Sequence, residues 1–174
     1  MIYLIAGQSA TGKTTQANIL NQDENFHKIV SYTTRDKRKN EKDDIDYHFI
    51  SEERFKELEK NNFFVAPVKY SGNYYGIAKK DLEEFHRASK NIILVLELSG
   101  IKEIKSKFED AISIYLDLDD AEMVARMKAR GDSPEKIKDR LENKQDFTGF
   151  ADYTIDGSKS IEEISKEIKA IVGI

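Results

Sequence analysis

The chain contains a glycine-rich segment with the spacing of a phosphate-binding loop. Residues 7–14 read Gly-Gln-Ser-Ala-Thr-Gly-Lys-Thr and match the pattern G-x-x-x-x-G-K-[ST] at every fixed position. Glycines allow backbone N–H groups to curl around a polyphosphate, and a helix N-terminus adds a favourable dipole. We therefore expect a nucleoside triphosphate site, in which Lys13 reaches the β- and γ-phosphates and the Thr14 hydroxyl ligates Mg²⁺. The predicted site residues are Gly7, Gln8, Ser9, Ala10, Thr11, Gly12, Lys13, Thr14 and Thr15.

A second group of charged side chains lies between residues 28 and 42, where six basic residues accompany two acidic ones. The whole chain has a formal net charge of −4, so this segment reverses the overall sign. Arginine binds phosphate through two parallel hydrogen bonds, and Arg35 and Arg38 therefore predict a site for a second phosphate. The alternative is a solvated basic loop. The basic residues are Lys28, Arg35, Lys37, Arg38, Lys39 and Lys42.

The elements that must position these side chains alternate between short apolar runs and longer amphipathic segments. This alternation is typical of βαβ units around a parallel sheet. The glycine-rich segment follows the first apolar run and precedes the first helical segment, as a phosphate-binding loop requires. The sequence thus predicts an α/β fold with a doubly wound parallel sheet of the P-loop NTPase type. We expect strands at 2–6, 92–96, 112–116 and 153–155, and helices at 14–20, 101–107, 121–130 and 161–172.

Two segments interrupt the alternation and are interpreted as inserts. Residues 31–88 are rich in aromatic side chains and predict a mixed α+β lobe. Residues 127–147 are highly charged and predict a helical hairpin, with Ser133 as an N-cap and Pro134 as the first helical residue. The core then comprises 1–30, 89–126 and 148–174. Within the lobe we expect strands at 47–50, 63–70 and 74–77, and helices at 52–60 and 79–88.

Composition excludes several classes of protein. The 174 residues include no cysteine, which excludes a disulfide framework and a thiolate zinc site and favours a reducing, cytoplasmic location. The apolar runs are far shorter than a membrane span, and the start lacks the features of a signal peptide. The overall negative charge argues against nucleic acid as a partner. No heptad pattern indicates an oligomeric state.

Characteristic blocks are spread along essentially the whole chain: S-Y-T-T-R-x-x-R-x-x-E at 31–41, D-Y-H-F at 46–49, Y-S-G-N-Y-Y-G at 70–76, E-L-S-G at 97–100, R-x-x-x-R-G at 126–131, Arg140, and D-Y at 152–153. In the order and spacing of these blocks the chain resembles the guanylate kinase family. The resemblance implies a P-loop core, a monophosphate-binding lobe at 31–88 and a lid at 127–147. It also implies an ATP-dependent nucleoside monophosphate kinase that uses Mg²⁺ to move the γ-phosphoryl group of ATP onto GMP or dGMP, giving GDP or dGDP.

The resemblance also implies roles for individual residues. An acceptor-phosphate clamp, a residue that orients its arginines, a group of catalytic cations and a set of base-contacting positions each have counterparts in this sequence. The clamp is Arg35, Arg38, Tyr47 and Tyr75, oriented by Glu41; the catalytic cations are Lys13, Arg35, Arg126, Arg130 and Arg140; the base-contacting positions are Ser31, Ala66, Ile77 and Glu97.

Two base-contacting positions depart from the family pattern. The acidic residue expected at position 66 is alanine, and the hydroxyl residue expected at position 77 is isoleucine. In addition, Val95 replaces the carboxylate usually found two residues before Glu97. Losing one polar contact to a base weakens discrimination by about 1–3 kcal/mol. Two alternatives to a GMP kinase therefore remain: a related kinase for another nucleoside monophosphate or a sugar phosphate, and a non-catalytic guanylate kinase-like binding module.

Overall fold

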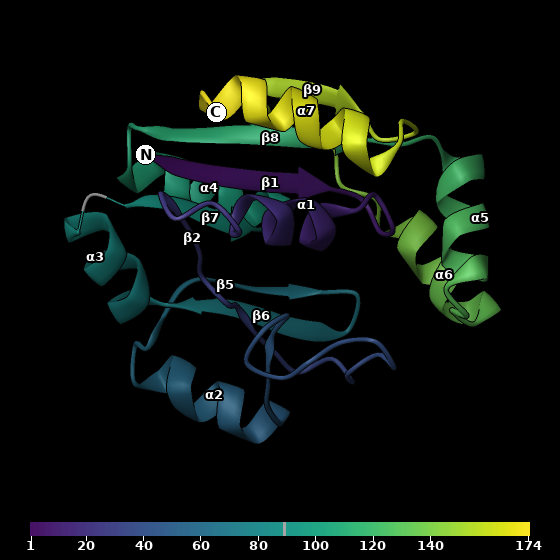
Figure 1. Ribbon diagram of the computed structural model, residues 1–174. Coiled ribbons are helices and arrows are strands. Elements are labelled where there is room, and N and C mark those ends of the chain that lie inside the picture. The colour runs from purple at the N-terminus through teal and green to yellow at the C-terminus, as the bar shows by residue number, and fades with distance from the viewer. Residues whose placement is uncertain (89) are drawn as a thin grey trace.

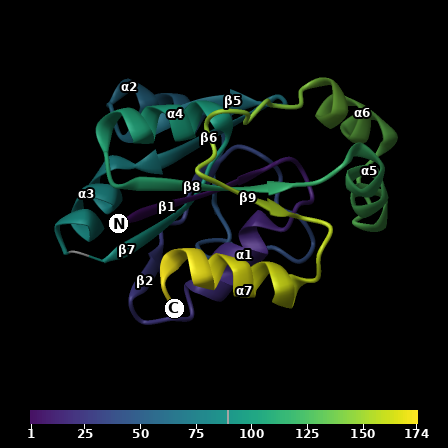
Figure 2. The same ribbon diagram turned by 90° about the horizontal axis from the view of Figure 1, so that it is seen from above.

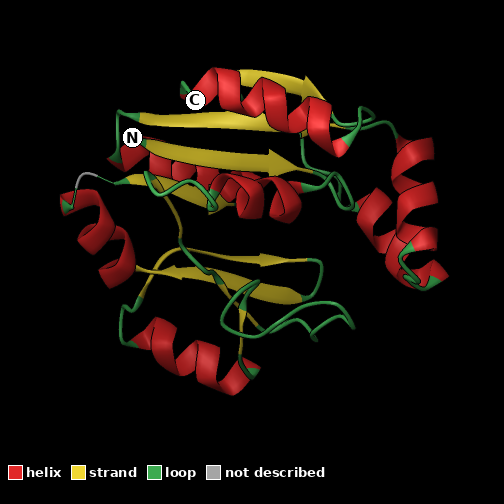
Figure 3. Ribbon diagram, viewed as in Figure 1, coloured by secondary structure: helices red, strands yellow, loops and turns green. Residues whose placement is uncertain are grey.

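The fold is built on a five-stranded sheet whose described strand pairs are all parallel (Figures 1 and 3). This computed structural model describes residues 1–88 and 90–174, and its strand order is β2-β7-β1-β8-β9. The central strand, β1, is buried along its whole length, as expected for a parallel strand covered on both faces. The predicted α/β fold is confirmed. The strands are β1 (Ile2–Gly7), β2 (Phe26–Lys28), β7 (Asn91–Val95), β8 (Ala111–Asp117) and β9 (Tyr153–Asp156).

Helices cover the two faces of this sheet. Helices α1 (Lys13–Leu20) and α7 (Ile161–Val172) lie on one face, and α4 (Leu98–Lys107) lies on the other (Figure 2). Alternate residues of β1 point to opposite faces, so Ile5 packs with α1 and α7 whereas Leu4 packs with α4. Among the described residues, no helix combines the length and apolar character needed to cross a membrane.

A second sheet of four strands, in the order β4-β3-β6-β5, lies beside α4. Its own core is aromatic, with the rings of Phe55 and Phe64 stacked at 4.4 Å between centroids. Ala66, Ile77 and Leu82 belong to the same apolar cluster as α4, so this part of the chain packs against the main sheet layer. The elements are β3 (Tyr32–Thr33), β4 (His48–Phe49), α2 (Glu52–Lys60), β5 (Phe64–Tyr70), β6 (Asn73–Ala78) and α3 (Lys79–Arg87).

The helical hairpin of α5 (Asp120–Ala129) and α6 (Pro134–Glu142) stands at the end of the sheet toward which β1 points (Figure 1). The turn between them contains Gly131 at φ 87°, a conformation that glycine adopts without strain. Ser133 caps α6 by accepting a hydrogen bond from the backbone N–H of Lys136. The hairpin packs around a small apolar cluster formed by the buried residues Leu118, Met123, Met127 and Ile137, against which Ala10 of the glycine-rich segment also packs.

The sequence did not predict β2 or β3. Strand β2 has only three residues and ends in lysine, and β3 has only two residues, so neither forms an apolar run. Helix α4 begins at Leu98, three residues before the apolar residue Ile101 on which its prediction depended. The predicted boundary between lobe and core at Ser89 lies outside the described residues.

Close packing around Gly76 yields a stability prediction. A Cβ at this position would lie 2.8 Å from two atoms of the Phe64 ring and 3.2 Å from Phe55 Cζ. We expect Gly76→Ala to lower the free energy of unfolding by about 1–3 kcal/mol through overpacking, measured by urea denaturation. Gly100→Ala is the control, because it replaces a helical glycine at which the three atoms nearest to an added Cβ belong to the Leu96 side chain, at 3.3 Å or more. Equal stability of the two variants would contradict this description of the aromatic core.

Candidate active site

The glycine-rich segment forms a loop between the carboxyl end of β1 and the start of α1. A Cβ on Gly7 would lie 2.6 Å from Thr11 Oγ1 and 2.8 Å from the Leu116 carbonyl oxygen, so only glycine fits there. Gly12 begins α1 at φ 93°, in the left-handed region. Lys13 Nζ donates hydrogen bonds to the carbonyl oxygens of Gly7 at 2.7 Å and Gln8 at 2.8 Å. The loop therefore folds around its own lysine.

Gln145, which the sequence did not assign to the site, connects this loop to the segment that follows the hairpin. Gln8 Nε2 donates to the carbonyl oxygen of Gln145 at 2.5 Å, and Gln8 is only 3% exposed. The side chain of Gln145 in turn accepts a hydrogen bond from the backbone N–H of Leu98 at 2.8 Å. One pair of amides thus links the loop, the segment after α6 and the start of α4. Gln145 lies between charged residues in the sequence, and no motif marks it.

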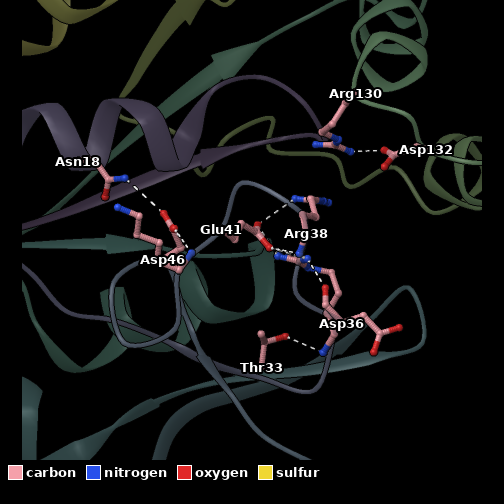
Figure 4. Close-up of polar contacts among 10 residues, drawn as sticks. Asn18, Thr33, Asp36, Arg38, Glu41, Asp46, Arg130 and Asp132 are labelled. Carbon is pink, nitrogen blue, oxygen red and sulfur yellow. Dashed lines mark hydrogen bonds and ion pairs between the residues drawn. The ribbon is translucent and has the colours of Figure 1, made fainter.

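Glu41 holds the two arginines of the predicted phosphate clamp. Arg35 donates to its carboxylate through both terminal nitrogens, at 3.0 and 2.8 Å. Arg38 donates to the same carboxylate from its backbone N–H at 2.8 Å and from Nη1 at 3.4 Å (Figure 4). Burial acts to raise the pKa of Glu41, but these hydrogen bonds outweigh it and the net pKa is lowered. Glu41 is therefore ionised and hydrogen-bonded to both arginines, and its role in orienting them toward a phosphate stays a prediction.

Tyrosine rings of the lobe contact arginines from both the lobe and the hairpin. The Arg35 guanidinium carbon lies 5.4 Å from the Tyr47 ring centroid, and the Tyr47 and Tyr75 rings lie 6.2 Å apart. On the hairpin side, the Arg140 guanidinium carbon lies 4.7 Å from the ring centroid of Tyr70, a residue that the sequence did not assign to the site. Burial is the main cause that raises the pKa of Tyr47 to about 12, so its hydroxyl is a hydrogen-bond donor at neutral pH.

The electrostatics of Lys13 show how strongly positive charge is concentrated here. Burial lowers the pKa of the Lys13 ammonium group to about 8. The carboxylate of Glu97 opposes this shift, whereas the guanidinium groups of Arg140, Arg130 and Arg38 add to it. Burial in turn raises the pKa of Glu97, against the attraction of Lys13 and Arg140. Such a site disfavours its own cations and favours an anion that neutralises them.

The hairpin arginines differ in their partners. Arg130 donates a hydrogen bond to the carboxylate of Asp132, which lies on the other side of the turn at Gly131 (Figure 4). Repulsion from Arg130 contributes to the lowered pKa of Arg38, after burial and Arg35, so the hairpin and lobe cations influence one another. Arg126 instead pairs with Glu122 along its own helix, with Nε and Oε1 2.9 Å apart. The sequence did not assign Asp132 to the site, although its position two residues after the candidate Arg130 could have indicated an ion pair between them.

Three of the predicted base-contacting positions are buried. Ser31 is 7% exposed, Ala66 3% and Ile77 0%. Ala66 has φ 51°, where the β5–β6 register is interrupted by a bulge. Ala66 and Ile77 lie in the apolar cluster with α4 and offer no polar side-chain atom to a ligand. The base-contacting roles of these residues, and of Glu97, remain predictions.

The residues present fit a magnesium ion that travels with a triphosphate. Among the described residues, no group of three or more histidine, cysteine, aspartate or glutamate side chains could hold a metal ion. Mg²⁺ usually keeps several waters and takes only one or two protein ligands together with substrate phosphates. Thr14, in the first turn of α1 directly after Lys13, supplies a hydroxyl oxygen of the kind that this ion prefers.

The whole chain is similar to known guanylate kinases. The family model for guanylate kinase matches residues 1–173. A guanylate kinase of Prochlorococcus marinus strain MIT 9312 is 36% identical over 143 residues, covering 80% of this chain and 78% of that protein. A second, from Prochlorococcus marinus subsp. pastoris, is 30% identical over 175 residues, covering 99% of this chain and 95% of that protein. The crystal structure of guanylate kinase from Anaplasma phagocytophilum has a TM-score of 0.77 at 28% identity, covering 98% of this chain and 83% of that one.

The lowered pKa of Lys13 predicts how stability depends on pH. The folded protein holds this proton less tightly than the unfolded chain, where the value is 10.5. Below pH 8 the charged lysine destabilises the fold, and the penalty disappears as pH rises toward 10.5. We expect Lys13→Met to stabilise the ligand-free protein by about 1–3 kcal/mol at pH 7, and the gain to shrink between these pH values.

Urea denaturation across this pH range measures the effect. Lys166→Met, at an exposed position of α7, is the control and should change stability by less than about 0.5 kcal/mol. If Lys13→Met stabilised the protein by the same amount at every pH, the pKa of Lys13 would not be lowered in the folded protein.

Proposed function

This chain belongs to the guanylate kinase family, and we propose the residues by which it performs the reaction of that family. It is an ATP-dependent nucleoside monophosphate kinase that transfers the γ-phosphoryl group of ATP to GMP. The single observation that best supports our assignment is the Glu41 carboxylate, which holds Arg38 and also Arg35, whose guanidinium lies beside the Tyr47 ring.

The acceptor phosphate binds, in our proposal, between the lobe arginines and the two tyrosines. The planar guanidinium of Arg35, already aligned by Glu41, donates two parallel hydrogen bonds to the phosphate oxygens. The hydroxyls of Tyr47 and Tyr75 donate to the remaining oxygens. Holding the acceptor in this way directs one phosphate oxygen toward the donor and removes most of the entropy cost of the encounter. An ionised phosphate oxygen is itself the nucleophile, so no protein group needs to remove a proton.

At the donor site, the backbone N–H groups of residues 7–14 surround the β-phosphate, and Lys13 exchanges its two carbonyl partners for phosphate oxygens. The Thr14 hydroxyl would hold Mg²⁺, which would neutralise charge on the phosphates. Because the phosphoryl group carries its charge on peripheral oxygens in the transition state, positioned cations supply most of the catalysis. Arg130 and Arg140 have this role on the lid side. Arg126 has the same assignment by resemblance, and it reaches the phosphates only if it leaves Glu122.

We further propose that residues 31–88 and 127–147 move as a lobe and a lid on the remaining core. Closure brings Arg35 and Arg140 together around the substrates and excludes water that would otherwise hydrolyse ATP. The lack of cysteine in the chain supports a cytoplasmic location for this reaction.

A comparison of acceptors tests the proposed function. We expect ADP release from ATP and Mg²⁺ to be fastest with GMP or dGMP in a coupled assay that also offers AMP, UMP, dTMP and ribose 5-phosphate. This panel is needed because Ala66 and Ile77 present no polar side-chain atom to a base. Lys13→Ala should lower kcat by about a hundredfold or more, since a central phosphate-binding cation is lost. Faster turnover with a non-guanine acceptor would overturn the choice of GMP, and unchanged kcat in Lys13→Ala would overturn the role of that residue.

The orienting role of Glu41 gives a separate prediction. Glu41→Gln removes the charge that fixes Arg35 and Arg38, and we expect KM for GMP to rise about tenfold while KM for ATP stays within about twofold. Asp36→Asn is the matched control, because Arg35 contacts only the backbone carbonyl of Asp36. If both variants gave the same KM for GMP, Glu41 would have no orienting role.

A further inference from the structure

The buried lysine of β2 belongs to the basic segment predicted to bind phosphate, but its contacts are elsewhere. Lys28 is only 7% exposed. A buried ammonium group is tolerated only where oxygen atoms replace its water. Lys28 Nζ donates to Asn18 Oδ1 at 2.6 Å and to the carbonyl oxygen of Ile45 at 2.7 Å. Asn18 lies on α1, the helix of the phosphate-binding loop, whereas Ile45 lies in the loop between β3 and β4. Lys28 therefore joins the donor side of the molecule to the acceptor side.

Asn18 makes a second contact across the same junction. Its Nδ2 donates to Asp46 Oδ1 at 3.4 Å (Figure 4). On the core side, Asn21 Oδ1 accepts a hydrogen bond from the backbone N–H of Lys28 at 2.6 Å, which fixes β2 to the end of α1. Lys28 is thus hydrogen-bonded to α1 and its C-cap at two points, by its backbone N–H to Asn21 and by its Nζ to Asn18.

The loop that Lys28 holds is a rigid unit. The backbone N–H of Asp46 donates to the Lys42 carbonyl at 3.0 Å, and its carboxylate accepts from the Lys42 N–H at 2.8 Å. The N–H of Asp44 donates to the Tyr47 carbonyl at 3.0 Å. Glu41 and Tyr47, both assigned to the acceptor clamp, directly flank this unit. Displacement of residues 42–46 therefore displaces both of them.

Apolar packing does not hold this loop against the core. The side chain of Ile45 is 53% exposed. A cavity of about 450 Å³ lies at the junction, and Asn18, Lys28 and Ile45 are among the residues that line it. The hydrogen bonds of Lys28 join Asn18 and Ile45, which both line this cavity, and so fix where the loop lies relative to α1.

We infer that Lys28 is a positioning residue for the acceptor: it fixes residues 42–46 to α1 and thereby sets Glu41 and Tyr47 at the correct place relative to the donor loop. The inference rests on the proposed function in taking GMP as the acceptor. Lys28 touches neither substrate and acts only through the loop.

The first experiment replaces the lysine by a side chain of similar length without charge or donors. We expect Lys28→Met to raise KM for GMP about tenfold with KM for ATP changed less than about twofold. Because methionine suits a buried site, the melting temperature should not fall. Lys90→Met is the control, since Lys90 is an exposed lysine that contacts only a backbone carbonyl at 3.3 Å. Equal shifts in both KM values, or no shift, would overturn the inference.

Two further variants separate positioning from a general structural effect. If Lys28 acts through Tyr47, the effect of Lys28→Met on KM for GMP should largely disappear in a Tyr47→Phe background, whereas fully additive effects would refute that route. Asn18→Ala removes the partner on α1 without burying a new charge. It should change KM for GMP in the same direction as Lys28→Met, and an unchanged KM would count against the inference.

Hydrogen exchange keeps this test distinct from a failure of the proposed function. If the wild-type protein transferred no phosphoryl group to GMP, the proposed function would fail, and amide exchange of residues 41–48 would then decide the inference alone. Lys28→Met should accelerate exchange in this segment and leave β5 and β6 unchanged. Unaltered exchange of residues 41–48 would show that the lysine does not hold the loop.

Discussion

The burial of Lys13 among other cations at the carboxyl end of β1 is the constraint on which the rest of the site depends. Burial is the main cause that lowers the pKa of Lys13, and the guanidinium groups of Arg140, Arg130 and Arg38 lower it further, against the carboxylate of Glu97. The protein satisfies these cations with oxygen atoms of its own: backbone carbonyls for Lys13, Glu41 for the lobe arginines and Asp132 for Arg130. Phosphates offer more charge per oxygen than carbonyls do, so a substrate can replace the carbonyl partners of Lys13 while Glu41 continues to hold the lobe arginines. The energy stored in crowding the cations thus becomes binding energy for anions.

The parallel sheet is the means by which this crowding is achieved. All five strands end on the same side, and β1 lies at their centre, between β7 and β8, so its loop meets segments from both halves of the chain. Apolar clusters on both faces make the sheet a stiff base. The lobe and the hairpin then approach from different directions, each with arginines supported by aromatic rings. The sheet fixes the position of Lys13, and the lobe and the hairpin each bring arginines toward it, so that cations from three parts of the chain lie near one another.

The sequence predicted those parts of the molecule that local chemistry specifies. The loop at 7–14 and the long amphipathic helix α7 have strong patterns, because glycine spacing and the 3.6-residue period act over a few neighbouring residues. Helix α2 was predicted with the bounds that it has, because Ser51 caps its first turn. Strands β2 and β3 were missed because their pairing, rather than their composition, makes them strands. In the site, the arginines followed from motifs, whereas Gln145, Tyr70 and the actual partners of Lys28 depend on distant segments that no local pattern records.

The hairpin's separate apolar cluster has a consequence for dynamics. Leu118, Met123, Met127 and Ile137 pack with one another, apart from the two clusters that cover the main sheet. A region with its own small core can unfold and refold as an independent cooperative unit, at a free energy well below that of global unfolding. Methionine adapts its shape without a large loss of packing energy, which lowers the barrier to such rearrangement. Because Ala10 of the phosphate loop packs against this cluster, substitutions in it can change both how often the hairpin opens and how firmly it contacts that loop, while the two clusters that cover the sheet stay unchanged.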